Sequence, residues 1–158
     1  MVPSPACGLH RTLGTISKRM NLPYHVSSKE TSSLRLWRNK DHRFRIIEYD
    51  KMIPFLRNID YILIEDGLSE PFEYFLKDQL EILPVLIERN QTKEIWSNYK
   101  ELKIKNYLNP ANINAIDTYG INAWQYSHEL FVSPELKEEL DFVAKGSLAF
   151  SKGFSLFA

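Results

Sequence analysis

Glu101 and Lys103 stand one residue apart in a stretch that could form a β-strand. In nucleases that use an E-x-K element, the carboxylate binds Mg²⁺ and the lysine assists the attacking water. This chemistry needs a second carboxylate on a neighbouring strand, which Glu81 or Glu88 could supply. Such a tripeptide also arises by chance in a chain that is 25% charged. A metal-dependent nuclease that uses Glu88, Glu101 and Lys103 is therefore one alternative.

Other residues with catalytic or metal-binding chemistry do not form a recognisable pattern. No histidine lies three or four residues from another histidine, and the single cysteine, Cys7, has one histidine nearby, His10, which is too few for a metal site. The chain has no glycine-rich phosphate loop, G-x-S-x-G elbow or G-x-G-x-x-G fingerprint. We therefore expect no catalytic residue, no bound metal and no cofactor.

The segment 119–126 mixes turn residues with large aromatic rings, a composition common where a loop contacts another protein. His128 and Glu129 follow it directly. Such a histidine can also simply form a hydrogen bond at the end of a strand. We predict that the residues that contact a partner are Tyr119, Trp124, Tyr126, His128 and Glu129.

The net charge is zero, but it is unevenly distributed. Residues 1–45 contain nine Lys or Arg and two Asp or Glu, a net charge of +7, and the rest of the chain contains eleven and eighteen, a net charge of −7. An acidic body favours a basic protein partner, and a basic region can bind nucleic acid or pair with the acidic body. The basic residues that define the nucleic-acid-binding alternative are Arg35, Arg38, Lys40, Arg43 and Arg45.

Length and composition predict one globular domain. The chain has 158 residues, of which 44% are hydrophobic, and no apolar stretch approaches the roughly 18 residues that would span a bilayer. The first residues are basic but lack the apolar region of a secretory signal. We expect a cytoplasmic protein with no membrane partner, in which 1–33 is an irregular basic lead-in and 34–158 is a single α+β domain.

Two amphipathic helices are predicted, over about 69–80 and 133–145. In each, a serine can cap the first turn, a proline follows within that turn, and an acidic residue complements the helix dipole. Ser69 is expected to cap the first helix after a turn at Asp66–Gly67, and Ser133 is expected to cap the second. Apolar residues at helical spacing predict that both helices pack on the core.

The expected strands form a mixed or antiparallel sheet. Pro84 indicates an edge or a bulge, 52–58 reads as a helical turn or loop, and 96–107 reads as a strand pair or a short helix. The residue composition predicts short strands over 34–37, 44–48, 59–64, 81–87, 130–132, 148–150 and 154–157.

Three segments, in this order, resemble a bacterial immunity-protein family of polymorphic toxin systems. They are IDYILIEDGLSEPFEYFLKDQLEILPVLI, LNPANINAID and ELFVSPELKEELDFVAKGSLAFS. The similarity covers about residues 46–152, and it includes Leu68–Ser69–Glu70, Leu83–Pro84–Val85, the segment from Asn112 to Asp117, and that from Phe131 to Leu140. The chain departs from the family pattern in its basic first 45 residues and at Pro134, where an acidic residue is more usual.

The resemblance implies a small cytoplasmic protein that binds and neutralises a cognate toxin protein without catalysis of its own. It supplies no family-wide binding residues and leaves the oligomeric state open. Under this interpretation a nucleic acid is not the expected partner. The nuclease and the nucleic-acid-binding module remain the alternatives.

Overall fold

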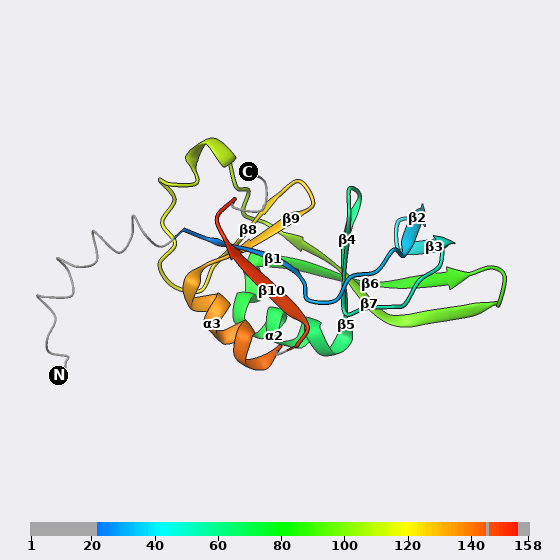
Figure 1. Cartoon of the computed structure of the whole chain (residues 1–158). Coiled ribbons are helices and arrows are strands. Elements are labelled where there is room, and N and C mark those ends of the chain that lie inside the picture. Colours follow the sequence, from blue (N-terminus) through cyan, green and yellow to red (C-terminus); the bar gives the residue numbers. More distant parts are fainter. Residues whose placement is uncertain (1–21, 145, 155–158) are drawn as a thin grey trace, which may run out of the picture.

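A computed structural model describes residues 22–144 and 146–154, which form two β-sheets and two α-helices (Figure 1). The fold class is α+β, as predicted. Helices α2 (Asp66–Leu76) and α3 (Pro134–Val143) lie together on one side of the molecule, and the β6–β7 hairpin extends away from them. No helix in the described residues is long and apolar enough to cross a membrane.

The smaller sheet has four antiparallel strands. In spatial order they are β10 (Leu148–Lys152), β1 (Tyr24–Ser28), β9 (Glu129–Val132) and β8 (Ala123–Tyr126). Strand β1 lies inside the predicted irregular lead-in, so that prediction is wrong over these five residues. Its sequence is short and largely polar, and its pairing partners β9 and β10 lie more than 100 residues further along the chain. The rest of the lead-in up to residue 21 lies outside the described residues.

The larger sheet has six strands and curls on itself. In spatial order they are β2 (Arg35–Lys40), β3 (Arg43–Glu48), β6 (Leu80–Arg89), β7 (Glu94–Ile104), β5 (Tyr61–Glu65) and β4 (Phe55–Asn58). All pairs are antiparallel except β3–β6. Although β6 and β7 separate β3 from β5, the rings of Phe44 and Tyr61 are only 5.3 Å apart. This contact shows that the two ends of the sheet enclose an apolar core.

Pro84 lies on β6, which is internal to the sheet. The neighbour β3 contacts β6 only opposite 86–88, and the pairing of β6 with β7 shifts register between Val85 and Ile87. The proline therefore lies beyond the end of β3 and next to an irregularity, where a missing backbone N–H is tolerated.

Helix α2 begins three residues earlier than predicted. It starts at Asp66, directly after β5, and its N-cap residue Glu65 makes no side-chain capping bond. Ser69 lies inside the helix, where its hydroxyl donates to the carbonyl oxygen of Asp66 at 2.9 Å. The predicted turn at Asp66–Gly67 and the predicted Ser69 cap are therefore wrong. The helix ends at Leu76, and a short 3₁₀ turn, η1 (Lys77–Gln79), leads into β6.

Helix α3 follows the prediction at its start. The Ser133 hydroxyl accepts from the backbone N–H of Leu136 at 3.3 Å, and Pro134 occupies the first turn. Leu136 and Leu140 are fully buried, as expected, but Val143 is exposed and Ala144 is buried instead. The buried residues of both helices join one core with residues from both sheets.

Three other segments differ from their predicted structure. Half of 52–58 forms strand β4, and 94–104 forms the single long strand β7 instead of a strand pair or a helix. The last part of the aromatic segment 119–126 forms strand β8. A second 3₁₀ turn, η2 (Pro110–Asn112), lies in the connection from β7 to β8. The expected strand 154–157 begins in a turn at Phe154, and its other residues lie outside the described ones.

Candidate functional site

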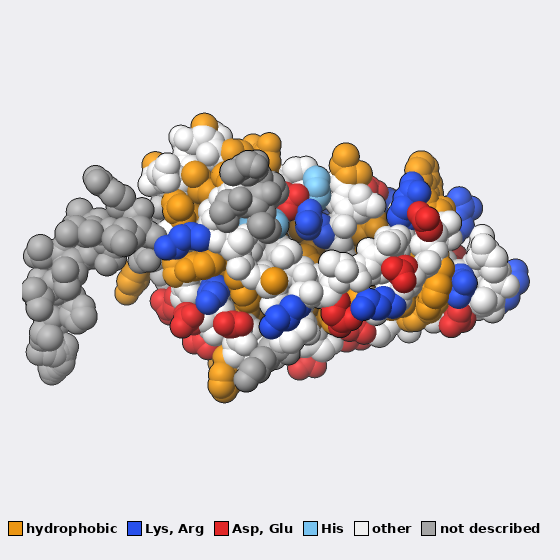
Figure 2. Space-filling model, viewed as in Figure 1, with side chains coloured by type: hydrophobic (Ala, Val, Ile, Leu, Met, Phe, Trp, Pro, Cys, Tyr) orange, Lys and Arg blue, Asp and Glu red, His pale blue; other side chains and the backbone are white. Residues whose placement is uncertain are grey.

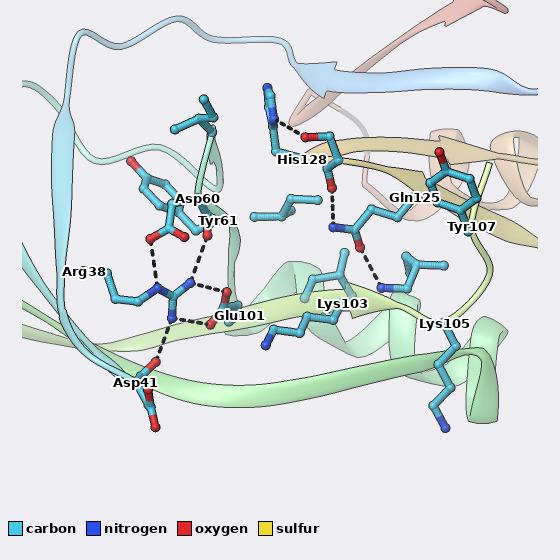
Figure 3. A pocket seen from close by; sticks show the side chains of 15 residues that line it. Arg38, Asp41, Asp60, Tyr61, Glu101, Lys103, Lys105, Tyr107, Gln125 and His128 are labelled. Atoms are coloured by element: carbon cyan, nitrogen blue, oxygen red, sulfur yellow. Dashed lines mark hydrogen bonds and ion pairs between the residues drawn. The ribbon is translucent and has the colours of Figure 1, made fainter. Parts of the chain in front are cut away.

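The guanidinium of Arg38 joins three parts of the curled sheet (Figure 3). Its two Nη atoms donate to both carboxylate oxygens of Glu101, at 3.1 and 2.6 Å. The remaining donors reach the carbonyl oxygen of Asp41 at 2.8 Å, and the side chain and carbonyl oxygen of Asp60, both at 2.9 Å. All five N–H donors are thus used. We call Arg38, Asp41, Asp60 and Glu101 the clasp.

The clasp ties the outer strand β2 to the β4–β5 turn and to β7. Glu101 is 3% exposed, so its charge is stabilised by the two hydrogen bonds from Arg38. The same hydrogen bonds raise the pKa of Arg38. The positive charge of Arg38 is therefore permanent, and carboxylates within the clasp balance it. These hydrogen bonds hold the sheet in its curled shape.

A groove of about 630 Å³ runs from the clasp to the β8–β9 hairpin. Strand β5 pairs with β7 only as far as Leu63 and Glu101, and β7 continues along the bottom of the groove to Ile104. There the Gln125 side chain accepts from the N–H of Ile104 at 2.8 Å. Gln125 and His128 line the far end (Figure 3). We call this hollow the clasp groove.

Aromatic side chains gather at the β8–β9 turn beside the clasp groove. Ser127 adopts the left-handed conformation, with φ of 56°, which allows the tight reversal between the strands. The Tyr126 ring lies 6.4 Å from Tyr107 and 6.3 Å from Phe154. Tyr107 is 69% exposed, and Tyr126 is partly exposed. The turn therefore presents aromatic surface to solvent next to a charged groove.

A second charge cluster lies at the base of this hairpin. Glu129 contacts the Nε2 atom of His25 at 2.6 Å, receives a hydrogen bond from Arg57 at 2.8 Å, and lies 3.2 Å from Nε2 of His128. His25 and Glu129 are both buried. Burial lowers the pKa of His25, and the hydrogen bond to Glu129 opposes this shift. The cluster joins β1 and β4 to the hairpin that borders the groove.

The structure separates the five predicted partner-binding residues. His128 lines the clasp groove, Tyr126 lies at the same hairpin turn but outside the groove lining, and Tyr119 is exposed in the loop before β8. Trp124 is buried against Leu108 and Phe131, and Glu129 is buried in the charge cluster. Trp124 and Glu129 therefore present little surface to a partner in this structure, and aromatic composition alone does not show which ring faces the core.

Glu88 does not converge with Glu101 and Lys103, whereas Glu81, the other candidate carboxylate, lies opposite Lys103 in the β6–β7 ladder. Glu88 pairs with Ile95 and Glu101 pairs with Leu83, so the two carboxylates lie six residues apart along β7, roughly 20 Å. Glu88 forms an ion pair with Arg43, and both oxygens of Glu101 are occupied by Arg38. The described residues contain no group of three His, Cys, Asp or Glu that could hold a metal ion.

The basic residues of the nucleic-acid alternative are mostly paired within the chain. Arg38 belongs to the clasp, Arg35 pairs with Glu48 at 3.3 Å, and Arg43 pairs with Glu88. Within the described residues, Lys40 and Arg45 form no ion pair. The β2–β3 hairpin over 35–48 still has five Lys or Arg and two Asp or Glu, a net charge of +3.

Acidic side chains gather instead on the helices. Figure 2 shows a group of them at the end of the molecule where α2 and α3 lie. The exposed acidic residues of α2, η1 and α3 are Asp66, Glu70, Glu73, Asp78, Glu135, Glu138, Glu139 and Asp141. The two helices thus form an acidic end, opposite in sign to the β2–β3 hairpin.

Sequence reasoning missed a group of exposed apolar residues near the clasp. Trp37, Ile47 and Ile59 are 60%, 45% and 79% exposed, and all three line a hollow of about 580 Å³ beside the clasp. Alternation along β2 could have indicated that Trp37 faces away from the buried Leu36. No local sequence pattern predicts that Ile59 lies near Trp37, because only the curl of the sheet brings these two residues together.

Comparison of the chain with protein-family models and with curated proteins finds no match.

Proposed function

We propose that the protein is a non-enzymatic immunity protein, which binds a cognate bacterial toxin in the cytoplasm and occludes its active surface. The observation that carries this proposal is a single face on which apolar side chains are exposed around the clasp, whose Arg38 has all of its donors occupied within the chain. Such a face suits protein binding, because its exposed apolar side chains can be buried against a partner without breaking the clasp.

The face is built by the β2–β3, β4–β5 and β8–β9 hairpins around the clasp groove. Figure 1 shows the last two projecting from the same side of the molecule. Tyr107 supplies an exposed ring at one end of the groove with Tyr126 next to it, and Ile59 lies at the turn that borders the other end. We call this surface the hairpin face.

Catalysis would require a different arrangement of the same groups. A metal-dependent nuclease needs carboxylates that are free to coordinate an ion, whereas Glu101 accepts two hydrogen bonds from Arg38. Neutralisation by binding requires only a complementary shape, exposed apolar side chains and a rigid framework. The resemblance over residues 46–152 is the reason for proposing a toxin as the partner.

Growth protection tests this proposal. Cells that produce the toxin encoded next to this protein should survive when they also produce the wild-type chain. A Tyr107→Ser, Tyr126→Ser double variant should protect less, because it removes exposed rings from the hairpin face. Phe142→Ser is the matched control, since Phe142 is 82% exposed on α3, away from this face.

Two results would contradict it. Absence of protection by the wild-type chain would remove the immunity assignment. Cleavage of DNA by the purified protein with Mg²⁺ or Mn²⁺ would replace it with the nuclease. Equal protection by the double variant and the control would move the toxin-binding surface away from Tyr107 and Tyr126.

A further inference from the structure

We infer that the hollow lined by Trp37, Ile47 and Ile59 is the anchor site of the hairpin face, and that it takes an apolar side chain flanked by carboxylates on a segment of the partner protein. We call this hollow the Trp37 groove. The inference rests on the proposed function for the identity of the partner, but its chemistry follows from the groove alone.

Three of the large exposed apolar side chains surround this one groove. Single exposed apolar residues are common, but three large ones around one hollow mark an interaction site. Trp37, Ile47 and Ile59 come from β2, from β3 and from the β4–β5 turn, so the groove is open between separate parts of the sheet. Figure 2 shows hydrophobic side chains at the outer tips over these hairpins, with Lys and Arg beside them.

The groove is held in shape before a partner arrives. Arg38 and Asp60 of the clasp form part of its lining, and their hydrogen bonds fix the distance between β2 and the β4–β5 turn. Tyr61 also lines the groove, and its buried ring packs against Phe44 at 5.3 Å. A preformed hollow loses less conformational entropy on binding than a mobile one.

The charges around the groove favour an acidic partner segment. Arg45 lies directly opposite Trp37 in the β2–β3 ladder, and neither Arg45 nor Lys40 forms an ion pair with the described residues. A carboxylate next to the inserted apolar side chain would meet Arg45, and a second carboxylate would meet Lys40. Arg38 has no donor left for a ligand, because all five are used within the clasp.

Selection of peptides on the full-length chain tests the groove without any knowledge of the toxin. Random dodecapeptides are displayed on phage and selected against the wild-type protein. Enriched peptides should carry a large apolar residue flanked by Asp or Glu, and should shift the emission of Trp37 to shorter wavelength. Trp37→Ser should weaken their binding at least about tenfold, and Arg45→Gln should weaken it by less and reduce its salt dependence.

Ile95→Ser and Phe142→Ser are the matched controls. Ile95 is 61% exposed near the tip of the β6–β7 hairpin and Phe142 is 82% exposed on α3, so each variant removes exposed apolar surface outside the groove. Both should bind the selected peptides like the wild type. A thermal melt of each variant shows that the loss at Trp37 is not a loss of folding.

Several outcomes would overturn the inference. One is that no peptide is enriched, or that enriched peptides are basic or bind Trp37→Ser normally. Another is that oligo(dT) binds with dependence on Trp37, which would make the groove a nucleic-acid surface. If selected peptides behave as expected but the toxin does not bind the protein, the proposed function fails and the groove chemistry stands. If the toxin binds Trp37→Ser normally, the groove is not its anchor.

Discussion

The two charge clusters that border the clasp groove differ in whether their cations can lose a proton. In the clasp, Arg38 is permanently charged and uses all five donors on Asp41, Asp60 and Glu101. In the cluster around Glu129, burial lowers the pKa of His25 below its ordinary value of 6.5, so this imidazole gains a proton only in acid. The cation at one end of the groove is therefore permanent, whereas the charge of the histidine at the other end depends on pH.

Removal of the Glu101 charge should have the largest effect. In Glu101→Gln, the buried side chain keeps one acceptor and directs an amide donor toward Arg38, so the guanidinium loses its main counter-ion. We expect the free energy of unfolding to fall by about 3–5 kcal/mol, measured by urea denaturation. The double variant Arg38→Met, Glu101→Leu should recover most of this loss, because it leaves no unpaired charge. A single variant as stable as the wild type would show that the clasp does not hold the sheet.

Acid should weaken the Glu129 cluster through protonation of His25. Burial lowers the pKa of His25 in the folded protein below its ordinary value of 6.5, so the unfolded chain binds more protons as the pH falls. The stability present above pH 6.5 should therefore decrease as the pH falls through the folded-state pKa. Denaturation at several pH values measures this slope.

The variant His25→Gln is the control for this slope. It should flatten the dependence between pH 7 and the folded-state pKa, since it removes the group that titrates, whereas the clasp double variant should keep it. If the pH dependence of stability is the same in His25→Gln as in the wild type, another group causes the acid sensitivity. The two charge clusters would then not differ in the way described.

The smallest effect should come from an exposed ion pair on the same hairpin as Arg38. The side chains of Arg35 and Glu48 are 62% and 58% exposed, and they lie 3.3 Å apart. Because water screens such pairs, Arg35→Gln should change the free energy of unfolding by less than about 1 kcal/mol. A loss comparable to that of Glu101→Gln would mean that burial does not distinguish the clasp from an ordinary surface pair.

Local chemistry explains which parts of the fold could be predicted. The Ser133 cap depends on residues within one helical turn, and its prediction is confirmed. Ser69 has the same local pattern, yet β5 runs directly into the helix three residues earlier and leaves Ser69 inside it. Strand β1 could not be predicted, because its five residues become a strand only between β9 and β10.

The site depends even more on distant contacts. Arg38 and Glu101 are separated by 63 positions, and only the curl of the six-stranded sheet brings them together. The composition of 119–126 and the His128–Glu129 pair after it directed attention to the β8–β9 hairpin, but composition could not show that Trp124 is buried while Trp37 is exposed. The sequence therefore indicated one of the hairpins beside the clasp groove, and the topology determined which other residues lie near it.

The decisive measurement is titration of the purified chain with the toxin that we propose as its partner. Binding is followed by titration calorimetry, toxin activity is assayed in the same samples, and the masses of both chains are measured afterwards. We expect a saturable complex, loss of toxin activity in proportion to the complex formed, and unchanged masses of both proteins. Absence of a complex, or inactivation that proceeds catalytically through cleavage or modification of the toxin, would contradict the proposal.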